Sequence, residues 1–302
     1  MIRRLPFLLA AISGLACLAP PASAQLPERL RRCLPYPTLA EEIWDMMPAP
    51  PPEREFFLDE IHLDGDTKLP KAELEKIAAD LMPSEPFAEP NWYNEVAQVA
   101  RGEWQDRGYF RVEITATPKQ LRHDQSSEHD AVMLHVQAGR QYRTGEIQML
   151  PSSPDDLLAF PLDELRQLVS LQRGDIFDTS KLRAAFDNLK RRYGENGYID
   201  FTAEPNFDVN DVDGVINLTL RLDQQKQFRV SKVTVLGLDP SLEAQLRSAV
   251  PVGEPFNYTK ILEFIHDHRS KLPDWAGPRD MELQRDQKQG LASVTFDFRD
   301  CP

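Results

Sequence analysis

Cysteine, glycine and positive charge are scarce in this chain of 302 residues, and each shortage excludes a class of protein. Three cysteines are too few for a disulfide framework or a four-cysteine zinc site. Fourteen glycines stand against 25 prolines, a ratio that favours stiff linkers over glycine-rich phosphate loops. Lys and Arg total 35 against 48 Asp and Glu, and the net charge of -13 argues against charge-driven binding to nucleic acid or anionic membranes. The hydrophobic content of 41% still allows folded cores.

Long apolar runs are absent except at the N-terminus. Arg3-Arg4 precede an uncharged apolar stretch over residues 5–18, and Ala22-Ser23-Ala24 offers the small side chains that signal peptidase requires. A membrane span needs about 20 residues, so the sequence predicts a cleaved signal peptide over residues 1–24 rather than a retained anchor. A lipoprotein signal at Cys17 is the weaker alternative, because glycine stands where leucine is preferred.

Residues 25–55 have the composition of a short helix followed by a linker. Thr38-Leu39-Ala40-Glu41 forms a capping box, and Leu39, Ile43 and Met46 then fall on one helical face. Pro50-Pro51-Pro52 predicts a stiff extended spacer behind this helix. Two interpretations stay open: a docking helix on a tether, or a helix folded back onto the first domain.

Beyond the linker the chain repeats itself. The same apolar-polar-apolar triplet recurs at Ile61-His62-Leu63, Ile147-Gln148-Met149 and Val233-Thr234-Val235, with a spacing of 86 residues in both intervals. A fixed period of this kind is typical of tandem structural units, each built from one supersecondary motif. The sequence therefore predicts three copies, each starting with a strand.

Two helices are expected after the first strand of each copy. The clearest is the second helix of the middle copy, where Leu182, Phe186, Leu189 and Tyr193 form one apolar stripe behind the predicted cap Thr179. The corresponding stripes are Trp92, Val96, Val99 and Trp104 in the first copy, and Ile261, Leu262 and Ile265 in the third.

In the first two copies the chain leaves the second helix through the same three-residue pattern. Gly108-Tyr109-Phe110 and Gly197-Tyr198-Ile199 share a glycine, a tyrosine and an apolar residue. The third copy has Pro273-Asp274-Trp275 in this place, so its exit is predicted to differ.

Two alternating strands joined by a polar turn end each copy. The order strand, helix, helix, strand, strand predicts an α+β fold in which two helices cover a three-stranded sheet. The expected divisions are residues 25–55 for the linker and 56–139, 140–225 and 226–302 for the three units, the last being divergent.

A turn between the two helices ends in Phe87, Phe177 and Phe256 in the three copies. The order of elements, with these turns and the Gly-Tyr positions, resembles the POTRA domains of outer-membrane assembly factors of the BamA and TamA type. In those factors a β-barrel follows the last POTRA unit, and no set of strands suited to a barrel remains in this sequence. The resemblance implies that the strand after the second helix is a free sheet edge able to accept an extended peptide. The implied edge residues are Val112, Ile114 and Ala116 in the first unit, and Asp200, Phe201 and Ala203 in the second. The other interpretation is that these strands serve only the fold.

The sequence offers no constellation for catalysis, a metal or a cofactor. Asp208–Gly214 is acidic, but Val212 and Thr219 occupy positions where a calcium loop needs oxygen ligands, so a hairpin turn is expected. His266 and His268 lack a partner ligand nearby in the sequence. We therefore expect a protein that is not an enzyme and that needs no cofactor.

Cys33 and Cys301 lie near opposite ends of the mature chain. Three units in a row would span about 90 Å, so a bridge within one chain requires a bent array. The two cysteines are a possible disulfide pair, and the sequence leaves open whether it forms within one chain, between chains or with a partner.

The function that these features favour is that of a periplasmic scaffold, either free in the periplasm or associated with the outer membrane. Its expected partners are exported or outer-membrane polypeptides, bound by strand addition during outer-membrane protein assembly or secretion. The alternative is an accessory subunit that docks to a separate barrel protein or envelope complex without binding substrate.

Overall fold

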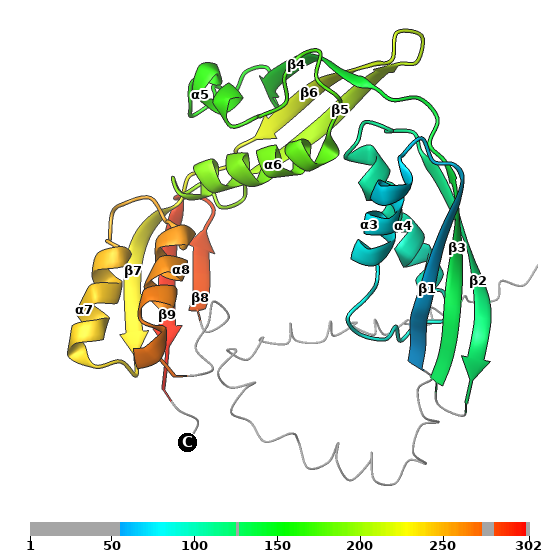
Figure 1. The fold of residues 1–302 in the computed structure, drawn as a ribbon. Helices are drawn as coiled ribbons and strands as arrows, with labels where there is room; N and C mark the ends of the chain where they lie inside the picture. The colour runs from blue at the N-terminus through cyan, green and yellow to red at the C-terminus, as the bar shows by residue number, and fades with distance from the viewer. Residues whose placement is uncertain (1–54, 125–126, 274–280, 300–302) are drawn as a thin grey trace, which may run out of the picture.

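The computed structural model describes residues 55–124, 127–273 and 281–299. The predicted signal peptide, the linker helix, Trp275 and the two cysteines Cys33 and Cys301 lie outside these residues. The described chain forms three small units that follow one another in a curved row (Figure 1). No helix among the described residues is long and apolar enough to cross a membrane.

Each unit is a three-stranded sheet with two helices, as predicted. Unit 1 comprises β1 (Glu55–Asp66), α3 (Lys71–Asp80), α4 (Trp92–Gln105), β2 (Glu113–His123) and β3 (Ser127–Gln137). Unit 2 comprises β4 (Arg143–Pro151), α5 (Leu162–Gln167), α6 (Thr179–Gly194), β5 (Thr202–Asn210) and β6 (Val215–Asp223). Unit 3 comprises β7 (Arg229–Leu236), α7 (Pro240–Ala249), α8 (Tyr258–Asp267), the short 3-10 helix η1 (Arg269–Lys271), β8 (Met281–Asp286) and β9 (Leu291–Asp297).

The strand order is the same in all three sheets. The last strand is central, pairing in parallel with the first strand and antiparallel with the strand that follows the second helix. The 86-residue spacing is a true structural period, because Ile61, Ile147 and Val233 face equivalent partners on the central strands. Those partners are Val132, Leu218 and Val294.

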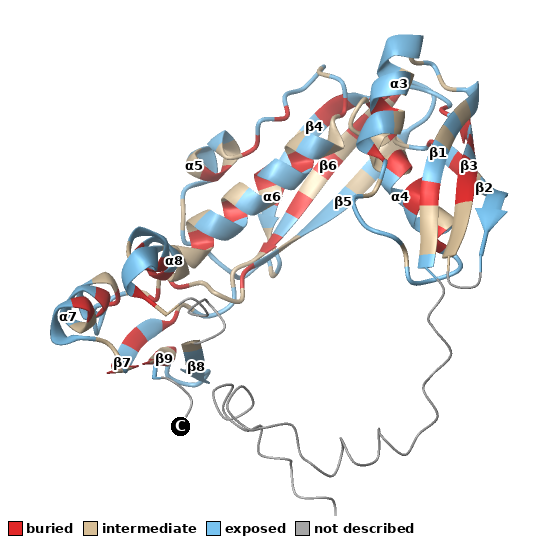
Figure 2. Cartoon of the chain, turned by 60° about the horizontal axis from the view of Figure 1, so that its bottom comes forward, coloured by how far each residue is buried: buried red, intermediate tan, exposed pale blue. Residues whose placement is uncertain are grey.

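The core of each unit lies between its helices and one face of its sheet (Figure 2). Large aromatic side chains fill the three cores at less than 2% exposure, among them Trp92 and Trp104, Phe177 and Tyr193, and Phe256 and Phe296. Burial of this much apolar surface on one face of a sheet provides the main driving force for folding of a unit of this size.

Two details of the helices differ from the sequence prediction. Asp178 caps α6 by accepting hydrogen bonds from the amides of Ser180 and Lys181, so the predicted cap Thr179 lies one residue inside the helix. Val99 and Leu262 are 61% and 39% exposed, because each stripe is narrower than the apolar pattern of the sequence.

The acidic stretch Asp208–Gly214 forms the end of the β5–β6 hairpin, as predicted. The amide of Gly214 donates to the carbonyl of Asn210 at 2.9 Å, and Gly214 adopts a φ of 69°. A positive φ at this place is typical of a tight hairpin connection.

Candidate protein-interaction site

The strand that follows the second helix lies at the outer edge of each sheet. β2, β5 and β8 pair with the central strand on one side, and no further strand among the described residues lies beyond them. A strand in this position has backbone N–H and C=O groups that can bind another chain.

Of the six residues predicted for the first two edges, Ile114, Ala116 and Ala203 lie in β2 and β5, whereas Val112, Asp200 and Phe201 come directly before these strands. Val112 and Phe201 are 4% and 6% exposed and belong to the cores, as does Ile114. Ala116 and Ala203 are half-buried against the same cores. Their side chains therefore cannot contact a partner freely, and only their backbone is available to one.

Asp200 has a different role from the other five. Its carboxylate accepts hydrogen bonds from Arg285 at 2.5 Å and from Gln287 at 3.3 Å, both in the hairpin of unit 3. The residue therefore contributes to the contact between units 2 and 3.

A proline interrupts each of the two predicted edges. Pro118 lies within β2 and Pro205 within β5, and the ladder that contains Pro205 runs from Thr202 to Asn210 without a register shift. Because proline cannot donate to the central strand, it fits an unbroken ladder only where the backbone nitrogen faces away from that strand. Both edges thus lack one donor where an incoming strand would need it.

The third edge, β8, contains no proline. Asp286 pairs with Leu291 at the hairpin end, as Asn210 pairs with Val215 in unit 2, so the two hairpins have the same register. Backbone groups in an antiparallel strand alternate between the partner and the free side. The free groups of β8 therefore belong to Met281, Leu283 and Arg285. The sequence did not indicate this edge, because the third unit lacks the Gly-Tyr residues that precede the edge strand in the other two units.

The two joints between units are built on the same backbone contact. The carbonyl of Gly108 accepts a hydrogen bond from the amide of Tyr142, and the carbonyl of Gly197 accepts one from Phe228, each at 2.8 Å. Both glycines have a positive φ, 87° and 84°. A Cβ at Gly197 would collide with the carbonyl oxygen of Phe228. The Gly-Tyr positions of the sequence are therefore the docking points of consecutive units.

A glutamine side chain adds a second hydrogen bond of the same kind at each joint. Gln141 donates to the carbonyl of Arg107 at 2.8 Å, and Gln227 donates to the carbonyl of Asn196 at 2.9 Å. Each glutamine lies two residues before the first strand of its unit, so the two joints share one geometry.

The joint between units 1 and 2 adds charged and aromatic contacts. Asp106 accepts a hydrogen bond from the Thr179 hydroxyl and forms an ion pair with Arg183 at 2.6 Å. The ring of Phe110 lies 5.6 Å from Phe177 and 5.2 Å from Phe207, centroid to centroid. These three rings close the apolar side of the joint.

The β5–β6 hairpin completes this joint. The hydroxyl of Tyr142 donates to the Asp211 carboxylate at 2.5 Å, and Arg111 forms an ion pair with the same carboxylate at 2.9 Å. Burial raises the pKa of Tyr142, and the bond to Asp211 raises it further.

The joint between units 2 and 3 has smaller side chains in the equivalent positions. Ile199 replaces Phe110, and Leu283 of β8 replaces Phe207, whereas the buried Phe256 matches Phe177. A groove of 430 Å³ lies here, and its apolar lining is formed by Tyr198, Ile199, Phe256, Tyr258, Met281 and Leu283.

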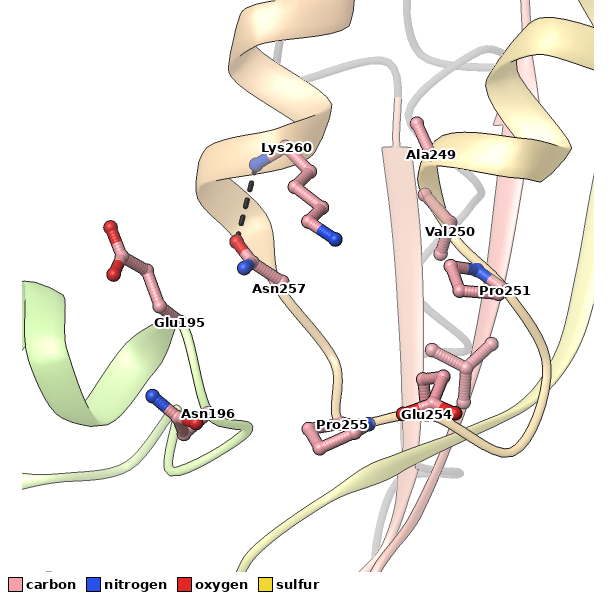
Figure 3. Close-up of a pocket in the computed structure, with 10 residues that line it drawn as sticks. Glu195, Asn196, Ala249, Val250, Pro251, Glu254, Pro255, Asn257 and Lys260 are labelled. Atoms are coloured by element: carbon pink, nitrogen blue, oxygen red, sulfur yellow. Dashed lines mark hydrogen bonds between the residues drawn. The ribbon is translucent and has the colours of Figure 1, made fainter. Parts of the chain in front are cut away.

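A polar cleft accompanies both joints. At the joint of units 2 and 3 it has a volume of 330 Å³ and lies between Glu195 and Asn196 on one side and Pro255, Asn257 and Lys260 on the other (Figure 3). At the joint of units 1 and 2 the equivalent cleft measures 620 Å³. Because equivalent residues line both, these clefts are a consequence of the joint geometry.

Metal-ligating side chains do not gather in the described part of the chain. No three His, Cys, Asp or Glu residues within residues 55–124, 127–273 and 281–299 could hold a metal ion together. The ring of His268 is engaged instead, with its two nitrogens 2.9 Å from the Phe264 carbonyl and from the Gln245 side chain.

Comparison with known proteins relates the three units to a known fold. Residues 157–225, which lie within unit 2, match the family model for POTRA, the surface antigen variable number repeat. Among solved structures, POTRA domains 3–5 of BamA from Haemophilus influenzae superpose with a TM-score of 0.59 at 18% identity, covering 83% of this chain and 99% of that one. POTRA domains 1–3 of Omp85 from Anabaena match at 15% identity with a TM-score of 0.34, over 82% and 97% of the two chains.

The three described units, with their mixed sheets in one strand order and their matching joints, thus have the fold of POTRA domains 3–5 of BamA, and the POTRA family model matches within unit 2.

Proposed function

We propose that this protein is a periplasmic protein-interaction scaffold that binds exported or outer-membrane polypeptides by strand addition. Its place would be outer-membrane protein assembly or secretion. The observation that carries the proposal is the row of three sheets, each with an outer edge strand whose backbone groups pair on one side only. The POTRA fold and the predicted signal peptide support the assignment to this compartment.

The expected interaction is made by backbone rather than by side chains. The apolar side chains at the start of β2 and β5 point into the cores, so a partner strand would meet mainly N–H and C=O groups. Such an edge selects for extended conformation more than for sequence, which suits a scaffold that handles many polypeptides.

A pair of peptides that differ only in their backbone tests strand addition. One is a nine-residue alternating Thr-Val peptide, and the other has the same side chains with N-methyl groups on every second amide. We expect the first peptide to bind and to slow hydrogen exchange of edge-strand amides, and the second to bind at least tenfold more weakly. Equal binding of the two peptides, or protection confined to the helices, would refute strand addition.

The prolines at two of the edges favour a second candidate function. Pro118 and Pro205 each remove a donor and place a ring where an added strand would lie. An accessory subunit that docks to one folded barrel protein or envelope complex would not need those edges. Mild crosslinking in an envelope extract separates the candidates, since recovery of a single stoichiometric partner together with no peptide binding would support the accessory role.

A further inference from the structure

We propose that β8, together with the apolar groove beside it, is a binding site for an extended polypeptide segment that carries an aromatic side chain and an acidic residue on one face. This inference rests on the proposed function in one respect, namely that the ligand is a polypeptide in extended conformation. It adds the location of the site and the side chains that the site selects.

The first step concerns the edge. β8 is the outer edge strand that lacks proline, whereas β2 and β5 contain Pro118 and Pro205. Its free N–H and C=O groups belong to the residues whose side chains face the groove, Met281 and Leu283. A strand paired with β8 would therefore place its own alternate side chains over the groove.

The second step concerns the shape of the groove. In the joint between units 1 and 2 the equivalent space contains the rings of Phe110 and Phe207, 5.2 Å apart. In the joint between units 2 and 3 these positions are Ile199 and Leu283, and the groove measures 430 Å³. Aromatic rings fill the equivalent space in the joint between units 1 and 2. An aromatic side chain from a partner is therefore the group that best fits the groove in the joint between units 2 and 3.

The third step concerns charge. Lys190 and Arg191 of α6 are exposed and line the same groove as Met281 and Leu283; we call these two cations the rim, and Asp187 is the one acidic residue in the lining. Among the residues that the structure describes, neither cation has a carboxylate partner, and Arg191 bonds only to the amide oxygen of Asn188 at 2.8 Å. A carboxylate on the partner strand could therefore form ion pairs with Lys190 and Arg191.

Position along the row supports the same site. In Figure 1 the C-terminal end of α6 lies next to α8 and β8, so the groove opens between two units rather than inside one. A partner bound there would contact units 2 and 3 at once and would hold their joint in the conformation described here.

The experiment uses a fluorescent seven-residue probe, Thr-Val-Thr-Phe-Thr-Asp-Thr, and the full mature chain. The phenylalanine and the aspartate lie two residues apart, so a strand conformation places both on one face. Three companion probes replace the phenylalanine by alanine, replace the aspartate by lysine, or methylate alternate backbone nitrogens. Binding is measured by fluorescence polarisation.

The key variant is Leu283→Phe, which fills the groove with a phenylalanine, the residue type present at the equivalent position Phe207 in the joint between units 1 and 2. We expect it to weaken binding of the phenylalanine probe at least tenfold and to leave binding of the alanine probe unchanged. Ile199→Phe fills the groove from the other side and should have the same effect. Leu157→Phe, at a position that is 88% exposed, is the matched control and should bind like the wild type.

The rim is tested by Lys190→Glu combined with Arg191→Glu. We expect a three- to tenfold loss of affinity for the aspartate probe, with partial recovery for the lysine probe. An unchanged hydrogen-exchange pattern at the Phe228 amide would show that the joint is intact in each variant.

The outcomes separate this proposal from the general function. Equal affinity of the phenylalanine and alanine probes, or wild-type binding by Leu283→Phe, would overturn the groove as a side-chain site and leave strand addition standing. Equal affinity of the probe and its N-methylated form would refute strand addition and, with it, β8 as the acceptor strand.

Discussion

The two joints of this protein share a backbone and differ in what surrounds it. In both, a glycine carbonyl accepts a hydrogen bond from the residue that precedes the next unit's first strand. Around this contact the first joint has three packed rings and an aspartate held by Thr179 and Arg183. The second has Tyr258 and Leu262 in place of those two residues, and an apolar groove. One repeated connection thus produces a joint whose apolar side is closed by rings and a joint whose apolar side is open.

This difference shows that the repeat determines the backbone geometry of a joint but not the role of the side chains around it. The hydrogen bonds of the joint come from the backbone and from two equivalent glutamines, so they persist when neighbouring side chains change. The side chains are then free to seal the joint or to leave room for a ligand. Four sets of substitutions test this comparison.

The largest effect is expected from Gly197→Ala. The substituted residue must keep a φ of 84°, and its Cβ collides with the Phe228 carbonyl oxygen, so the joint has to open. We expect a loss of about 3 kcal/mol in the free energy of unfolding, measured by urea denaturation, and faster exchange of the Phe228 amide.

Two glycine variants sharpen this result. Gly108→Ala should cost less, because its closest contact is the side chain of Ile176, which can move. Gly102→Ala in α4 meets nothing within 4 Å and should stabilise the protein by up to about 1 kcal/mol. A neutral Gly197→Ala would show that the backbone contact does not hold the joint.

Phe110→Ile converts the closed joint toward the open one. It removes ring contacts to Phe177 and Phe207, and we expect a loss of about 1–2 kcal/mol by urea denaturation. The reverse change, Ile199→Phe, should cost nothing or stabilise. If both variants were destabilising by equal amounts, the two joints would not be interchangeable in packing.

Tyr142→Phe gives the first joint the residue that the second has at Phe228. The loss of the bond to Asp211 should cost about 1 kcal/mol at pH 7. Since the folded-state pKa of Tyr142 lies above its unfolded value of about 10, this contribution is complete below pH 10 and declines as the pH rises toward the raised value.

Thermal unfolding of both proteins between pH 7 and pH 11.5 measures this dependence. The wild type should lose stability more steeply above pH 10 than Tyr142→Phe. Parallel pH profiles would mean that the hydroxyl of Tyr142 does not stabilise the joint.

The smallest effect is expected from Asp200→Arg, which faces Arg285. Both side chains are partly exposed, so the cost should be about 0.5 kcal/mol at low salt and less at 0.5 M salt. Adding Arg285→Asp should restore most of the loss in a double-mutant cycle. A coupling free energy of zero would remove this ion pair from the description of the joint.

The repeat, the order of strands and helices and the hairpin turn were predictable from the sequence. Their signals are local, such as the triplet at Ile61 and its two copies or the stripe that begins at Leu182. The predicted Gly-Tyr positions were also correct as landmarks. Their role in docking was not predictable, because the partners Tyr142 and Phe228 lie more than 30 residues further along the chain.

The candidate site was predictable only in outline. The sequence indicated which strand is an edge, but the effect of Pro118 and Pro205 depends on which way each backbone nitrogen faces, and this requires the pairing register. The groove depends on four segments that meet only in the folded joint. Its one sequence signal is the exchange of Phe110 for Ile199 and of Phe207 for Leu283, visible once the copies are aligned.

The ion pairs at the two joints have opposite polarity. The residue after the Gly-Tyr-apolar triplet is Arg111 in the first joint, facing Asp211, and Asp200 in the second, facing Arg285. Deleting unit 2 would bring Arg111 against Arg285, and duplicating it would bring Asp200 against Asp211. Like charges would repel in both rearrangements, so the polarity of these ion pairs disfavours a row in which unit 2 is deleted or duplicated.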